Sequence, residues 1–266
     1  MLLTVIYSFT NWDGLNPLPD FVGLNNYIKV IQDPVFVQLI KNTVILTIFY
    51  IPILNLLAML FAILNNDMTK LKSVSKVLLF LPNMLSAVVV SFIWLLIYEY
   101  NIGLLNKVLE SLALGFLKTN WLGNEYMVLF AIGIAILWTA LGFYMLIYQA
   151  GLNAIPEEIY EAAELDGAGW FSKHLYLTIP MMKEHIRTNL ILSIIGVLGT
   201  FELPYIMTKG GPLHFSETTA VRIYLYSFSE NQESKGLALA VLMALVTMLI
   251  TILILKPGMK KGDRDV

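Results

Sequence analysis

The most informative part of this sequence is a short polar stretch. It begins with Glu161-Ala162-Ala163-Glu164-Leu165-Asp166-Gly167-Ala168 and ends with Leu177-Thr178-Ile179-Pro180. Long apolar runs lie on both sides of it. Lipid offers no partner for charged side chains or for free backbone groups, so this stretch must lie outside the bilayer. There it is available to dock a soluble protein.

The composition indicates a membrane protein before any motif is considered. The chain is 58% hydrophobic and only 14% charged, and its mean hydropathy of +0.72 lies above the range of soluble domains. A net charge of −2 gives no reason to expect a nucleic-acid partner. The chain has no cysteine, which excludes disulfides, thiolate metal sites and cysteine nucleophiles.

Hydropathy predicts several membrane-spanning helices, each of which needs about 20 mostly apolar residues. Four stretches meet this length, namely residues 41–64, 77–98, 127–150 and 237–255. A fifth, 186–207, is apolar except for Asn189 and Glu202, and we expect Pro204 to break its outer end.

The distribution of basic residues predicts the orientation of these spans. If the polar stretch is cytoplasmic, the inner segments hold ten Lys and Arg residues and the outer segments seven, which is the usual direction of the bias.

The polar stretch itself predicts a helical hairpin. Pro156 suits the start of a helix, and the acidic Glu157 and Glu158 complement the positive end of its dipole. Gly167 is a natural left-handed cap at the other end. A second short helix should then lead toward Pro180.

One face of the first helix is expected to carry small and aliphatic side chains, because Ile159, Ala162, Ala163 and Asp166 recur at three- and four-residue spacing. Small side chains would let another protein approach closely. The spacing alone leaves two interpretations open: a docking element, or an ordinary amphipathic surface hairpin between two spans.

The same stretch resembles the EAA loop of ABC importer permeases. In that loop a Glu-Ala-Ala, a Gly four residues after the second Ala and a distal Pro mark the segment that the ATPase subunit contacts. The resemblance implies that Glu161, Ala162, Ala163, Asp166, Gly167 and Pro180 couple this chain to an ATPase. His174 departs from the pattern, which usually has Phe at that position, so local packing should differ there.

The resemblance extends along nearly the whole chain. Residues 21–27, 42–43, 80–82, 121–123, 151–156 and 208–212 look like blocks of carbohydrate-type importer permeases, in the expected order. The implied fold is an all-α transmembrane bundle of the type I ABC importer permease kind, with a six-helix core. Residues 1–9 are too short to span, covering about 14 Å as a helix, so we expect the chain to start midway through its first transmembrane helix. Residues 1–266 would form one permease domain, with a cytoplasmic coupling loop at about 152–183.

The resemblance also implies partners and a location. The partners would be a second, homologous permease subunit, ATPase subunits at the cytoplasmic loop and an extracytoplasmic solute-binding protein, all at a bacterial or archaeal cytoplasmic membrane. The solute would be a sugar or sugar derivative, moved by alternating access. ATP and Mg²⁺ would bind the partner ATPase, and no cofactor would bind this chain.

A neutral sugar needs hydrogen-bonding and stacking groups within a water-filled cavity, because polar groups facing lipid are costly. The candidates that we favour within the spans are Asn83, Trp138, Asn189 and Glu202. Each has a competing structural interpretation, since Asn often bonds across helices and Trp often only packs. Glu202 is the strongest of the four, because an acid near a helix break commonly faces a cavity.

The sequence predicts no enzyme. It lacks the G-x-x-x-x-G-K-[ST] phosphate loop, and its three histidines, His174, His185 and His214, have no metal-site spacing. Two other function classes stay open on the residues alone: an ion-coupled secondary transporter and a non-transporting membrane scaffold. On the outer side, Gly210-Gly211-Pro212 predicts a turn, and residues 218–229 have the spacing of a re-entrant or interfacial helix.

Overall fold

The computed structural model describes residues 1–16, 18–68 and 71–262, and these residues are almost wholly helical. Lys70 and Arg264, two of the basic residues counted for the orientation, lie outside the described residues. Among the described residues, four helical stretches are long and apolar enough to cross a membrane, and the number is five if one bent pair of helices forms a single crossing. The all-α transmembrane fold predicted from the sequence is therefore confirmed.

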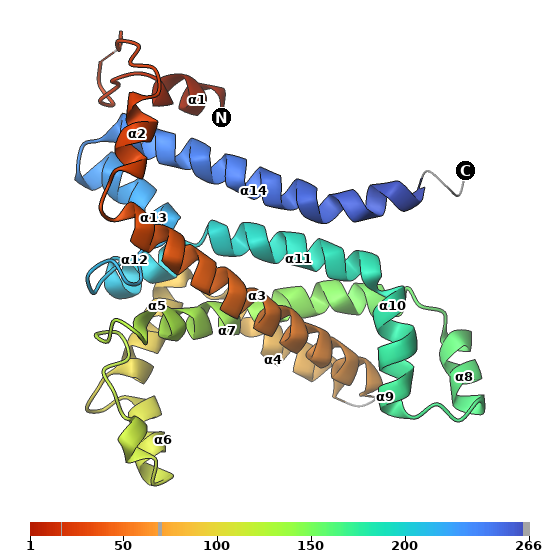
Figure 1. The fold of residues 1–266 in the computed structure, drawn as a ribbon. Helices are drawn as coiled ribbons and strands as arrows, with labels where there is room; N and C mark the ends of the chain where they lie inside the picture. Colours follow the sequence, from red (N-terminus) through yellow and green to blue (C-terminus); the bar gives the residue numbers. More distant parts are fainter. Residues whose placement is uncertain (17, 69–70, 263–266) are drawn as a thin grey trace.

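The predicted spans correspond to named elements. They are α3 (Phe36–Asp67), α4 (Lys72–Met84) with α5 (Ala87–Tyr98), α7 (Val128–Asn153), α11 (Lys183–Leu198) with α12 (Glu202–Thr208), and α14 (Glu233–Gly262). Residues 2–8 form the short α1 (Leu2–Ser8), followed by α2 (Asn25–Ile31). The two ends of the bundle carry the shorter elements (Figure 1).

Two details of the predicted spans were wrong. Residues 77–98 are not one straight span, because α4 and α5 meet at an angle of 98°. Pro82 removes one backbone donor near the bend, and the Ser86 hydroxyl accepts a hydrogen bond from the Val89 N–H (3.3 Å), which starts α5 afresh. The span predicted at residues 186–207 breaks before Pro204, between α11 and α12. Pro204 lies in the first turn of α12, where a missing N–H costs little.

The core lies where α3 crosses α7, and α4 and α11 pack beside them (Figure 1). Small residues allow the close approach: Ala58 and Ala62 of α3 and Ala135 of α7 are fully buried. A second, smaller core joins α2 and the start of α14 through residues that include Tyr27, Val30, Tyr226 and Leu239. The two cores hold the helices that position the functional segments at either end.

One end of the bundle, which the sequence predicts to be the inner end, carries the polar hairpin, and the opposite end, predicted to be the outer one, carries the remaining short elements (Figure 1). The hairpin consists of α8 (Glu157–Leu165), α9 (Trp170–Lys173), the π-helix η2 (His174–Thr178) and α10 (Ile179–Met181). The outer elements are α6 (Leu104–Ser111), the 3₁₀ turn η1 (Gly115–Leu117), α13 (Thr219–Tyr224) and the π-helix η3 (Leu225–Ser229). The helix predicted for residues 218–229 is therefore confirmed.

Candidate functional site

The polar hairpin closes as the sequence predicts at its glycine. Pro156 caps α8 and Glu157 and Glu158 occupy its first turn. Gly167 has a φ of +79°, in the left-handed region. Its N–H bonds to the carbonyl oxygen of Glu164 (3.0 Å), and the next N–H, of Ala168, bonds to that of Ala163 (2.9 Å). This pair of bonds satisfies the last carbonyls of α8 and turns the chain toward α9.

The predicted coupling residues are unequal in exposure. Glu161, Ala162, Asp166, Gly167 and Pro180 are exposed, whereas Ala163 is buried. The expectation of one small-residue face was therefore wrong in part: Ala162 and Ala163 are neighbours about 100° apart around the helix, so only one of them can face outward. The exposed residues of α8 are mostly acidic, and Ala163 lies on its buried side.

Polar contacts join the two arms of the hairpin to each other, and one contact fastens the hairpin to the bundle. The Trp170 indole N–H donates to Asp67 Oδ2, at the end of α3 (2.7 Å). Tyr160 of α8 shares a hydrogen bond with the Thr178 hydroxyl (3.1 Å). Lys173 Nζ lies 2.8 Å from Glu164 Oε1, which joins the two arms of the hairpin. The segment is thus a braced unit and not a loose loop.

His174, the residue that departs from the family pattern, packs as an aromatic ring and makes one side-chain hydrogen bond. Its ring meets Trp170 edge-on, with the ring centroids 4.6 Å apart. Nδ1 lies 3.0 Å from the Thr178 hydroxyl, and Nε2 lies 3.7 Å from Asp67. Burial lowers the pKa of His174 and outweighs the opposing effect of Asp67, which favours the neutral imidazole at pH 7.

The four candidates for the solute pathway lie apart. Asn83 is exposed beside the α4–α5 bend, and Glu202 is exposed in the first turn of α12. Trp138 is half-buried and meets Trp94 edge-on, with centroids 5.9 Å apart. Asn189 is fully buried, donates to the Tyr144 carbonyl (3.2 Å), and leaves its side-chain oxygen without a partner. No hydrogen bond joins any two of these four residues in the described part of the chain.

A buried polar contact ties three spanning helices together. The Tyr148 hydroxyl of α7 donates to Asn55 Oδ1 of α3 (2.8 Å), and Asn55 Nδ2 donates to Ser193 Oγ of α11 (3.1 Å). All three side chains are buried. This is the structural use of Asn and Ser between membrane helices, and it locks α3, α7 and α11 together.

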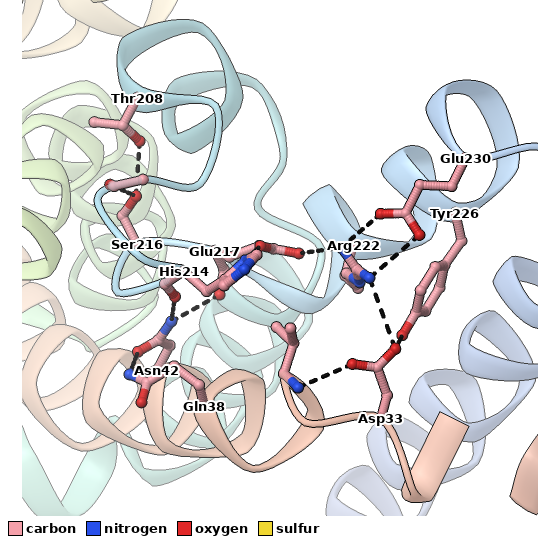
Figure 2. A network of polar contacts seen from close by, with 12 residues as sticks. Asp33, Gln38, Asn42, Thr208, His214, Ser216, Glu217, Arg222, Tyr226 and Glu230 are labelled. Carbon is pink, nitrogen blue, oxygen red and sulfur yellow. Dashed lines mark hydrogen bonds and ion pairs between the residues drawn. The ribbon is translucent and has the colours of Figure 1, made fainter. Parts of the chain in front are cut away.

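The structure adds a cluster of charges on the outer side that the sequence reasoning missed (Figure 2). We call it the outer charge cluster; it consists of Asp33, Glu217, Arg222, Glu230 and Lys235, with Tyr226 among them. Arg222 lies 2.9 Å from Glu230, 3.6 Å from Glu217 and 3.7 Å from Asp33. Asp33 also binds Lys235 Nζ (2.6 Å) and accepts a hydrogen bond from the Tyr226 hydroxyl (2.6 Å).

The centre of the outer charge cluster is buried and electrostatically matched, whereas Glu230 at its edge is exposed. Asp33, Arg222 and Glu217 keep 9%, 8% and 1% of their side-chain surface exposed. Burial acts to raise the pKa of Asp33, but hydrogen bonds from Lys235, Tyr226 and the Val35 N–H outweigh it and lower the pKa to about 2. Burial likewise opposes the charge of Arg222, yet Tyr226, Glu217 and Glu230 raise its pKa. Both groups therefore stay charged at any physiological pH.

The same cluster positions the outer loop that contains Gly210-Gly211-Pro212. His214 of this loop pairs with Glu217. Asn42 of α3 donates to the carbonyl oxygens of His214 (2.7 Å) and Glu217 (2.9 Å). The loop is thereby held between α3 and α13, as Figure 2 shows. Sequence separation hid this arrangement, because Asn42 and Glu217 are 175 residues apart.

Arg222→Gln is expected to destabilise the folded protein by about 3–5 kcal/mol, because it leaves buried carboxylates without their shared cation. Thermal unfolding of the detergent-solubilised protein measures the effect. The matched control is Arg187→Gln, since Arg187 makes a pair with the exposed Glu184 and should change stability by less than about 1 kcal/mol. Equal melting temperatures for the two variants would contradict the role assigned to Arg222.

Comparison with known proteins shows which family this chain belongs to. Residues 33–256 match the family model described as binding-protein-dependent transport system inner membrane component. The chain belongs to this family. A trehalose/maltose transport system permease protein of Thermococcus litoralis is 32% identical over 98% of this chain and 92% of the relative. An arabinooligosaccharides transport system permease protein of Bacillus subtilis is 32% identical over 91% of this chain and 78% of the relative.

A solved structure gives the same fold. The chain superposes on a subunit of a bacterial ABC transporter involved in the import of the acidic polysaccharide alginate, with a TM-score of 0.82. That match has 19% identity and covers 97% of this chain and 89% of that one. The type I importer permease fold and the membrane location predicted from the sequence are confirmed. Membership of this family does not favour the two alternatives, the ion-coupled secondary transporter and the scaffold.

Proposed function

We propose that this chain is a permease subunit of an ATP-driven importer for a sugar or sugar derivative. The observation that carries the proposal is the exposed acidic hairpin at the inner end of a bundle that belongs to a binding-protein-dependent transport family. Several relatives that cover most of the chain have names that refer to sugars, including trehalose/maltose, arabinooligosaccharides and lactose. The solute class is inferred from those names together with the uncharged polar candidates within the spans.

The hairpin is the proposed contact with the partner ATPase. Glu161, Ala162, Asp166 and Gly167 are exposed on α8 and its cap, and Pro180 is exposed on the second arm. Acidic side chains on α8 suit a groove that offers basic groups or free N–H donors. Because the hairpin is tied to Asp67 and its two arms are joined by the contact between Tyr160 and Thr178, a push on α8 would move it as one lever.

The transport cycle then follows from linkage. ATP and Mg²⁺ bind the ATPase subunits, and their closure brings the hairpins of this chain and of a second, homologous permease together. The two bundles switch to an outward-facing state, accept the solute from an extracytoplasmic binding protein, and release it inward after hydrolysis. Asn83, Trp138, Asn189 and Glu202 are proposed as solute contacts in the state that brings them to a common cavity. Reciprocity requires that an outward-facing permease favour the closed ATPase dimer.

Glu161→Lys is expected to reduce the amount of ATPase that co-purifies with this chain by at least about tenfold, because it reverses a charge at the centre of the proposed contact. The measurement is a pull-down of the intact membrane complex, with co-purifying ATP hydrolysis as the readout. Glu110→Lys is the matched control, since Glu110 is an exposed acid on α6 at the other end of the bundle. If the two variants retain the same ATPase, the hairpin is not the docking site. If no ATPase accompanies the wild-type chain, the importer proposal itself fails.

A further inference from the structure

We propose that α3 transmits the engagement of the binding protein at the outer loop to the coupling hairpin, with Asn42 and Asp67 as the positioning residues at its two ends. This inference rests on the proposed function, because it needs a binding protein outside and an ATPase inside, and it takes the outer loop as the segment that the binding protein touches. It adds a specific physical link between them. The link consists of one continuous helix that is hydrogen-bonded to a functional segment at each end.

At the outer end, the link is the side-chain amide of Asn42. This residue is 1% exposed, and its two N–H donors are both used on the outer loop, at the His214 and Glu217 carbonyls. Gln38, one turn earlier on α3, donates to Asn42 Oδ1 (2.9 Å) and fixes the orientation of the amide. Thr43 adds a contact between its hydroxyl and that of Thr219 (3.3 Å) at the start of α13. The outer loop cannot shift without breaking these bonds or moving α3.

At the inner end, the link is the carboxylate of Asp67, the last residue of α3. It accepts the Trp170 indole N–H at 2.7 Å, and His174 Nε2 lies 3.7 Å away. Both partners belong to the second arm of the coupling hairpin. Asp67 is 39% exposed, and its charge makes it a stronger acceptor for the indole N–H than a neutral oxygen would be.

Between the two ends, α3 can act as a strut. It is a single helix of 32 residues, which corresponds to about 48 Å at 1.5 Å per residue. Figure 1 shows it running from the end that carries α2 and α13 to the end that carries α9. Pro52 lies within the helix but does not divide it. Asn55 then fastens α3 to α7 and α11, so a shift of α3 carries the core with it.

The functional interpretation makes a prediction that a purely structural one does not. If Asn42 and Asp67 only stabilise the fold, their loss lowers stability and leaves the coupling between the two sides of the membrane intact. If they transmit a signal, their loss separates the two sides: the ATPase still hydrolyses ATP, but it no longer responds to the binding protein. The two effects are measured independently.

The experiment uses the complete transporter in lipid nanodiscs, and it compares ATP hydrolysis with and without solute-loaded binding protein. The variants are Asn42→Asp, which replaces both N–H donors with acceptors, and Asp67→Ala, which removes the acceptor of Trp170. Thr47→Ala is the matched control on α3, because the Thr47 hydroxyl bonds only to the Thr43 carbonyl of the same helix (2.7 Å). Asp67→Asn is the conservative variant, because its amide oxygen can still accept the indole N–H.

We expect Asn42→Asp and Asp67→Ala to lose at least about fivefold in stimulation by the binding protein, with hydrolysis in its absence kept within about twofold. Thr47→Ala and Asp67→Asn should respond like the wild type. The double variant Asn42→Asp/Asp67→Ala should respond no worse than either single variant, because both changes interrupt one link. Losses that multiply in the double variant, or normal stimulation in either single variant, would overturn the proposal.

Two other results of this experiment also have a clear meaning. If Asn42→Asp does not assemble, Asp67→Ala with its conservative partner still tests the inner end, and normal stimulation there is sufficient to reject the link. If the wild-type complex contains no ATPase or ignores the binding protein, the proposed function fails, and that result is distinct from loss of response in the variants alone.

Discussion

Replacing Gly142 with alanine should abolish most of the folded protein. Gly142 lies where α7 crosses α4, and a Cβ atom built on it would overlap the carbonyl oxygen of Leu79 and lie 2.6 Å from the Phe80 Cα. Both neighbours are backbone atoms of a helix, so neither can move aside as a flexible side chain does. Overpacking of this kind costs about 1–3 kcal/mol or more, and here it separates two helices of the core. We expect a loss of monodisperse protein after detergent extraction, measured by size-exclusion chromatography.

Gly133 provides the matched control, because it lies on the same helix. Its added Cβ would meet only side-chain carbons of Leu46 and Phe49, at 3.6 Å and beyond, which is ordinary van der Waals contact. Gly133→Ala should therefore leave the yield within about twofold of the wild type, and alanine is the better helix former. A similar loss in both variants would indicate a general sensitivity of α7. A normal yield of Gly142→Ala would show that the α4–α7 crossing can open.

The sequence was sufficient for those features that depend on local rules. Hydropathy located the spans, since the length of an apolar run is set by the thickness of the membrane. The left-handed Gly167 was also predictable, because glycine after a helix is the usual way to end it. The α4–α5 bend had a local signal in Pro82 and Ser86, but a continuous apolar run outweighed it in the prediction. Hydropathy indicates which residues can lie in lipid, but it does not indicate where a helix bends.

The outer charge cluster could not be predicted, because its members come from distant parts of the chain. Asp33 precedes the first long span, whereas Arg222 and Lys235 follow the outer loop near the end. Each is an unremarkable charge in its own segment. Only the fold brings Arg222 and Lys235 within 4 Å of Asp33 and shields the three charges from water. The link from Asn42 to the outer loop has the same origin, since one amide in an apolar helix has many possible uses.

The conformation of Gly167 leads to the strongest functional prediction. Gly167→Pro is expected to reduce solute uptake by at least about tenfold while the helix bundle stays folded. Proline fixes φ near −65°, whereas this residue needs +79°, and proline has no N–H for the Glu164 carbonyl. The end of α8 would open and the two arms of the hairpin would lose their relative orientation. The rest of the protein should be spared, because an added Cβ at Gly167 meets no atom within 4 Å.

A graded series separates backbone conformation from side-chain contact at this position. Asn tolerates the left-handed region better than other non-glycine residues, so Gly167→Asn should keep most of the uptake, whereas Gly167→Pro should not. Gly169→Ala is the control two residues away, since Gly169 has a φ of −69° and open space around it. Uptake of radiolabelled solute into proteoliposomes is compared with the melting temperature of each variant. If Gly167→Asn and Gly167→Pro fail equally, a partner needs the bare glycine surface; if both work, the turn has no part in coupling.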